Sequence, residues 1–170
     1  MTKICLIFNV AIFVLLLDAI QCECDIETGM RYESKHLCEL LQNTTDQIRE
    51  EFNEIFANAA NLTKEQLNDN IVSWATKYGG SFERELRQYL ADEADYWNRR
   101  YETLVKRIQE ANATAEAKKE LLEVIEFEQD MDTKFSEYET KLEQISQKYS
   151  QATHDEAVKI WTQIDTFDTE

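Results

Sequence analysis

The chain has 170 residues, enough for one domain, with 34 acidic and 18 basic side chains and a net charge of −16. A surface this acidic repels nucleic acid and anionic lipid, which we exclude as partners, and favours cations or basic proteins. Proline is absent and only three glycines occur, so long helices are permitted and a β fold is disfavoured. We therefore predict an all-α fold, a bundle of five or six helices, two of them long and antiparallel.

Residues 1–21 have the features of a secretory signal peptide, because Lys3 is followed by an almost unbroken apolar run over residues 4–17. This run is too short for a bilayer core of ~30 Å, which needs ~20 apolar residues. An uncleaved anchor is the alternative. No other stretch is apolar enough to cross a membrane, so we predict a secreted, extracellular protein with no membrane association after cleavage.

Four cysteines occur, and Cys5 lies within the predicted signal peptide. Cleavage after Gln21 leaves three cysteines, and cleavage after Cys22 leaves two. Secreted chains meet an oxidising compartment, so we predict a disulfide between Cys24 and Cys38. It would tie the N-terminal tail to the first helix.

Apolar side chains at helical spacing predict three helices, over residues 31–42, 45–59 and 63–78. Thr63 and Gln66 form a capping box at the start of the third, in which each side chain binds a backbone amide near the other residue. This is the best-defined helix boundary in the sequence.

A fourth helix is predicted from Ser81 to about residue 108, after Gly79 ends the third helix in a left-handed conformation. A turn within residues 111–117, with Thr114 as the cap, would fold the rest of the chain back on this helix. One continuous rod is the alternative, but it would leave too much apolar surface in contact with water.

From Leu121 the apolar spacing is close to a heptad repeat. Two rows of residues spaced seven apart form one a/d seam: Val124, Met131, Tyr138 and Ile145 in one row, and Phe135, Leu142 and Tyr149 in the other. Such a seam predicts either an intramolecular hairpin or a dimer. A last helix follows, with Thr153 and Glu156 as its capping box.

The sequence carries no catalytic signature. The two histidines, His36 and His154, lie in no recognisable motif, and no metalloprotease, nucleophile-elbow or phosphate-binding signature is present. His154 directly follows the predicted Thr153 cap, where a solvent-facing residue is expected. We predict a protein without enzymatic activity.

An acidic run over residues 120–132 is the candidate cation site. Glu123, Glu126 and Asp130 fall on one helix face by their spacing, and hard cations such as Ca²⁺ or Mg²⁺ prefer several oxygens together. The run departs from an EF-hand, because Lys134 and Lys141 stand at two of its ligand positions. A solvated acidic face is the alternative.

Three N-glycosylation sequons begin at Asn43, Asn61 and Asn112, each with threonine at the third position. All three fall at predicted helix boundaries, where a glycan would be exposed.

Aromatic side chains are frequent and include Trp74, Trp97 and Trp161. We expect them to pack in the core. An enclosed cavity for a fatty acid or a similar apolar ligand is the alternative.

One combination of residues is characteristic of a family: Phe52, Ile55, Asn58, Asn61-Leu62-Thr63, Gln66-Leu67, Ile71, Trp74 and Lys77-Tyr78-Gly79. This stretch resembles the SXP/RAL family of small secreted nematode proteins, several of which are known as antigens and allergens. The similarity is best over about residues 46–150, within a single domain predicted for residues 22–170.

The resemblance implies an all-α fold, secretion and no enzymatic activity, and the family's domain carries the label "cation-binding". We therefore expect an extracellular antigen with weak divalent-cation binding, interaction with host or parasite proteins, or both. Carriage of a fatty acid or similar ligand in the helical bundle is the alternative.

Overall fold

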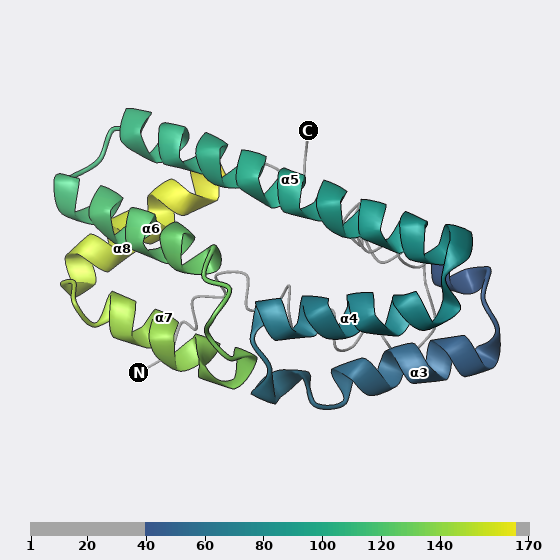
Figure 1. The fold of residues 1–170 in the computed structure, drawn as a ribbon. Helices are drawn as coiled ribbons and strands as arrows, with labels where there is room; N and C mark the ends of the chain where they lie inside the picture. The colour runs from purple at the N-terminus through teal and green to yellow at the C-terminus, as the bar shows by residue number, and fades with distance from the viewer. Residues whose placement is uncertain (1–39, 166–170) are drawn as a thin grey trace. The chain divides into compact units, whose positions relative to one another are not determined.

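The computed structural model describes residues 40–165, which contain a helical stretch at residues 40–42, six further α-helices, two short 3₁₀-helices and no strand (Figure 1). The predicted all-α fold class is confirmed. The predicted signal peptide, Cys24, Cys38 and the far end of the last helix lie outside the described residues, so these predictions stay predictions.

The chain divides into two compact units. The N-terminal unit is described over residues 40–94 and 132–136, and the C-terminal unit over residues 95–131 and 137–165. Helix α5 (Gly80–Glu110) contributes its first half to one unit and its second half to the other. Each unit has its own buried residues and is described by itself.

In the N-terminal unit, α3 (Asp46–Phe56) is followed by the 3₁₀-helix η2 (Ala59–Asn61) and by α4 (Lys64–Tyr78). The predicted capping box at the start of α4 is confirmed in both directions, with the Thr63 and Gln66 side chains each bound to the other's backbone. Helix α4 ends at Gly79, whose φ of 59° lies in the region that favours glycine.

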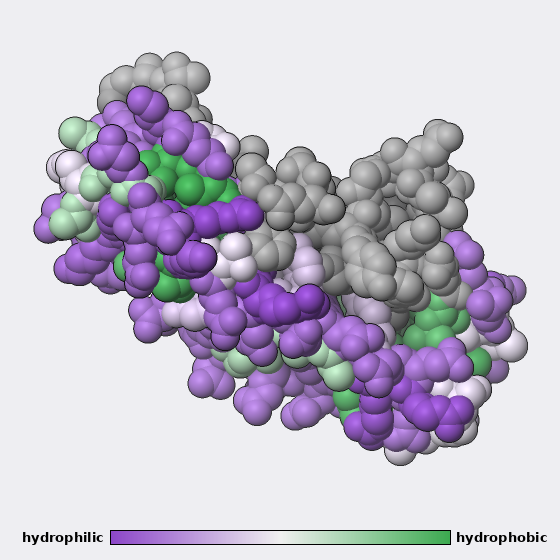
Figure 2. Space-filling model, turned by 90° about the horizontal axis from the view of Figure 1, so that it is seen from above, coloured by the Kyte–Doolittle hydropathy of each residue, from purple (hydrophilic) through white to green (hydrophobic). Residues whose placement is uncertain are grey.

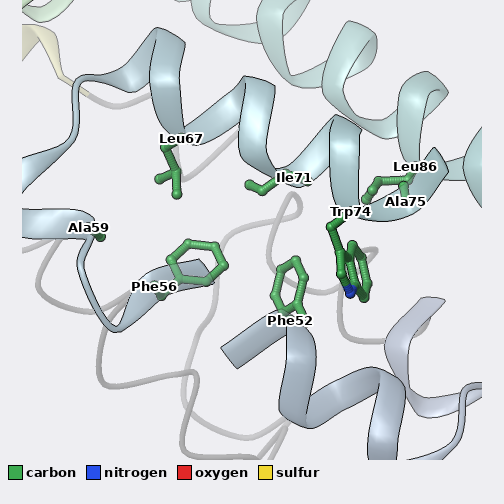
Figure 3. Packing of buried hydrophobic residues seen from close by; sticks show 8 residues of the cluster. All are labelled: Phe52, Phe56, Ala59, Leu67, Ile71, Trp74, Ala75 and Leu86. Carbon is green, nitrogen blue, oxygen red and sulfur yellow. The ribbon is translucent and has the colours of Figure 1, made fainter. Parts of the chain in front are cut away.

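The core of the N-terminal unit is rich in aromatic rings from α3 and α4 (Figure 3). The Phe52 ring lies 5.0 Å from both the Phe56 and Trp74 rings, and Trp74 meets Phe82 edge-on at 5.3 Å. Phe135 packs against this cluster, and its backbone N–H donates to the Leu62 carbonyl at 3.1 Å. These contacts place residues 132–136 in the N-terminal unit.

The C-terminal unit contains the second half of α5 and the helices α6 (Ala115–Glu128), α7 (Tyr138–Ser146) and α8 (Gln151–Ile164). The predicted turn between α5 and α6 is confirmed, with Thr114 as the N-cap of α6. Side-chain contacts join the start of α6 to α8 and its middle to the residues just before α8. Helices α6 and α8 therefore run side by side in opposite directions.

The predicted heptad seam does not form one continuous helix. Helix α6 ends at Glu128, and helical structure resumes with η3 (Phe135–Glu137) and α7. In this interruption, Phe135 packs against the core cluster of the N-terminal unit instead of continuing the seam. Met131, predicted for the seam, is 41% exposed.

The predicted start of the last helix is wrong by three residues. Ser150 is the N-cap of α8, and its Oγ accepts from the Thr153 N–H at 3.2 Å. Glu156 does not complete a capping box with Thr153, because both of its carboxylate oxygens bind Thr114.

Candidate functional site

The carboxylates of α6 that face α8 are the best-defined polar cluster of the C-terminal unit, and they include part of the predicted cation site. Glu123 and Glu126 lie on α6, and Asp130 follows two residues after its end. Glu126 is exposed, whereas Glu123 and Asp130 are half-buried. The helix therefore ends before the third predicted ligand, and only the first two share its regular geometry.

Glu123 is already neutralised within the chain. One of its oxygens lies 2.7 Å from Lys148 Nζ, and the other accepts from the Tyr149 hydroxyl at 2.7 Å. These two hydrogen bonds hold the pKa of the Glu123 carboxyl below its usual range. Burial and the bond to Glu123 raise the pKa of the Tyr149 phenol. A cation at Glu123 would have to compete with the Lys148 ammonium.

The described residues 40–165 contain no group of three or more histidine, cysteine, aspartate or glutamate side chains that could hold a metal ion. Glu123, Glu126 and Asp130 are thus not brought together as a preformed ligand set. A cation bound here would have one or two protein ligands, and the predicted site stays a prediction.

Glu120 is the buried member of the cluster, with only 2% of its surface exposed. Its Oε1 lies 2.5 Å from Nδ1 of His154, so a hydrogen bond connects α6 to α8 at this point. Its Oε2 is buried and has no hydrogen-bond partner among the described residues. The expected solvent-facing position of His154 is wrong, because its side chain is only 19% exposed and contacts Glu120.

The spacing of apolar residues in the sequence could have identified Glu120 as a buried residue. It lies three residues after Ala117 and four before Val124, both of which are buried. This spacing places Glu120 on the apolar face of α6. A charged side chain on such a face requires a partner, because an unpaired buried charge is costly.

Glu156 on α8 holds the start of α6. Its Oε1 accepts from the Thr114 backbone N–H at 3.0 Å, and its Oε2 accepts from the Thr114 hydroxyl at 2.6 Å. These two bonds hold the pKa of the Glu156 carboxyl below its usual range.

Arg100 on α5 is a second buried charge that sequence reasoning missed. It is 2% exposed and forms ion pairs of 3.0 Å with Glu128 and Asp165. Its guanidinium also lies 5.5 Å from the centre of the Trp97 ring and 5.7 Å from that of Trp161. Both tryptophans are therefore part of the packing around a cation.

The sequon residues Asn43, Asn61 and Asn112 are all exposed. No helix within residues 40–165 is long and apolar enough to cross a membrane.

In a comparison with protein families, residues 2–111 match the model of the SXP/RAL-2 family protein Ani s 5-like, metal-binding domain. The chain belongs to the SXP/RAL-2 family. The match confirms the resemblance seen in residues 52–89. It ends before α6, so the acidic run over residues 120–132 of this SXP/RAL-2 protein lies outside the matched part. No curated protein and no solved structure matches the chain significantly.

Removing one partner of the Glu120–His154 pair should cost more than removing both. His154→Leu leaves a buried carboxylate without the one hydrogen-bond partner it has within residues 40–165, and we expect a loss of about 3 kcal/mol in the free energy of unfolding. The double substitution E120L/H154L should recover at least half of that loss, because no buried charge is left unpaired. Urea unfolding followed by far-UV circular dichroism measures both. Equal stability of single and double variants would show that the pair does not couple α6 to α8.

The Glu123 interactions should make stability fall in acid. The folded-state pKa of Glu123 is depressed, so its contribution is present above the unfolded pKa of about 4.3 and is lost as pH falls through the folded pKa. We expect wild-type protein to exceed E123Q in urea midpoint at neutral pH, and the difference to shrink toward pH 3. The control is E126Q, which removes an exposed carboxylate from the same helix.

Proposed function

We propose that this SXP/RAL-2 protein is an extracellular, non-enzymatic binding protein that holds Ca²⁺ or Mg²⁺ weakly through surface carboxylates. The observation that carries the proposal is the match of residues 2–111 to a family domain described as metal-binding. The net charge of −16 supports it, because an acidic surface raises the local concentration of cations.

The coordination chemistry of these ions is compatible with a site that has few protein ligands. Mg²⁺ gives up its water reluctantly, keeps several water molecules and is held by one or two carboxylates. Such a site needs no group of three protein ligands. It binds weakly, because few protein oxygens replace the hydration shell.

We propose that one or two of the carboxylates of Glu123, Glu126 and Asp130 form one such site. Glu126 is exposed and lies one helical turn from Glu123. The Lys148 ammonium on Glu123 is the competing cation. Binding here is therefore expected to release Lys148, and to be weaker than at a site without a lysine.

The acidic surface also fits basic partners. On the face shown in Figure 2, hydrophilic residues cover most of the described surface, and hydrophobic atoms appear only in separate small areas. We propose that host or parasite proteins with a basic surface bind the chain by charge, with salt-dependent affinity.

Calorimetric titration of the full chain with Ca²⁺ and with Mg²⁺ tests the cation proposal. The triple variant E123A/E126A/D130A should lose most of the binding heat. The matched control E85A/D92A/E102A removes three exposed carboxylates of α5, inside the part matched by the family model. If only the control variant loses binding heat, the cation site lies in the part of the chain matched by the family model. No heat in the wild-type protein rejects the proposal.

Carriage of a fatty acid or similar ligand is the second candidate, and one observation favours it. Trp74 is 3% exposed, and within residues 40–165 its Nε1–H makes no hydrogen bond of normal length and angle, although it interacts weakly with the Tyr78 hydroxyl. A buried donor that is poorly satisfied costs up to about 1–3 kcal/mol. The carboxylate of an apolar ligand among the rings of Figure 3 would supply a stronger acceptor.

Displacement of a fluorescent fatty acid tests this candidate. If Trp74 donates to the ligand, W74F should weaken binding about tenfold, as expected for one lost bond to a charged group. W97F removes a half-buried tryptophan from the C-terminal unit and should leave binding unchanged. Wild-type protein that binds no probe rejects the carrier function.

A further inference from the structure

The three sequons of the chain occupy the same structural position. In each one the threonine is the N-cap of a helix: Thr45 caps α3, Thr63 caps α4 and Thr114 caps α6. Each sequon asparagine therefore lies two residues before a cap, in the segment that enters the helix. No sequon lies inside an α-helix.

The threonine hydroxyls are all engaged in these caps. Thr45 Oγ1 accepts from the Ile48 N–H at 3.4 Å, and Thr63 Oγ1 accepts from the Gln66 N–H at 3.1 Å. Thr114 Oγ1 accepts from the Ala117 N–H at 3.3 Å. It also donates to Glu156 at 2.6 Å, which ties it to α8.

The asparagines differ from the threonines in exposure and in function. Asn43, Asn61 and Asn112 are all exposed, and none belongs to a buried cluster. A glycan on any of them would point into solvent without displacing a core residue. In each sequon, the asparagine that would carry the glycan is exposed, whereas the threonine hydroxyl stabilises the fold.

We propose that Asn43, Asn61 and Asn112 carry N-linked glycans, which are attached before α3, α4 and α6 acquire their caps. This inference rests on the secretion included in the proposed function. In the reaction, the asparagine amide nitrogen forms a bond to the anomeric carbon of a lipid-linked oligosaccharide. The bond from that carbon to the lipid diphosphate breaks, the diphosphate leaves, and a base on the transferase takes the amide proton.

The order of events follows from the motif. Serine and threonine share a hydroxyl group, so the transferase reads that hydroxyl at the third position. In the folded chain the same hydroxyl is held in a cap worth about 1 kcal/mol. Opening a cap is required at all three sites, and Asn112 also requires release of Thr114 from Glu156. Asn112 therefore belongs to the sequon whose hydroxyl is engaged both in a cap and in a contact with a distant helix.

Expression of the full chain in a secreting eukaryotic host tests occupancy. Peptide N-glycosidase converts each glycosylated asparagine to aspartate, which peptide mass spectrometry detects. We expect conversion at all three sites, and three unconverted asparagines would overturn the proposal. Protein in the medium and protein kept in the cells are analysed separately, so a failure of secretion is distinguished from a failure of glycosylation.

Matched substitutions separate the asparagine from the threonine. N112Q and T114A both abolish the sequon, but only T114A should lower the free energy of unfolding, since it also removes the cap and the bond to Glu156. T114S should keep both the glycan and the cap. Equal stability of N112Q and T114A would contradict the division of roles.

The timing is tested with unglycosylated full chain from bacteria, presented to a purified transferase with its lipid-linked oligosaccharide. The control is L86D/L121D, in which a charge replaces one fully buried leucine in each unit. Loss of helical structure in this variant is verified by circular dichroism. We expect at least tenfold faster modification of the unfolded variant, most clearly at Asn112. Equal rates for the folded and unfolded chains would overturn the order of events.

Discussion

Side-chain caps set the starts of α3, α4, α6 and α8 in a chain that has no proline to mark a helix start, whereas α7 begins without one. Thr45, Thr63, Thr114 and Ser150 each place a hydroxyl oxygen on a free backbone N–H at a helix start. Each bond satisfies a donor that no residue of the helix can reach. Because most residues of the chain favour a helix, these caps determine where α3, α4, α6 and α8 begin.

Local patterns were sufficient for much of the fold. The capping box of Thr63 and Gln66, the stop at Gly79 and the cap at Thr114 involve residues within one helical turn, so the sequence could reveal them. The predicted start of α8 is wrong because Thr153 and Glu156 also have the spacing of a capping box. Its actual partner is Thr114, 42 residues away in the chain.

The interruption after α6 shows the limit of periodicity. The heptad spacing is real, but it does not specify which core receives each apolar residue. Phe135 packs in the N-terminal unit, whereas Val124 and Ile145 are buried in the C-terminal unit. One segment with a single apparent period thus serves two cores, and only the long-range contacts show it.

The sequence predicted the acidic residues of the candidate site, but it did not predict which side chains they contact. An acidic helix was evident, but the sequence does not tell which carboxylate is buried against His154 and which is neutralised by Lys148. These pairings use part of the negative charge that would otherwise attract a cation. Glu120 stabilises the contact between α6 and α8, Glu123 stabilises the contact between α6 and the residues just before α8, and Glu126 is exposed to solvent. A divalent ion therefore competes with the fold for the same carboxylates, which is the physical reason to expect weak binding in this part of the molecule.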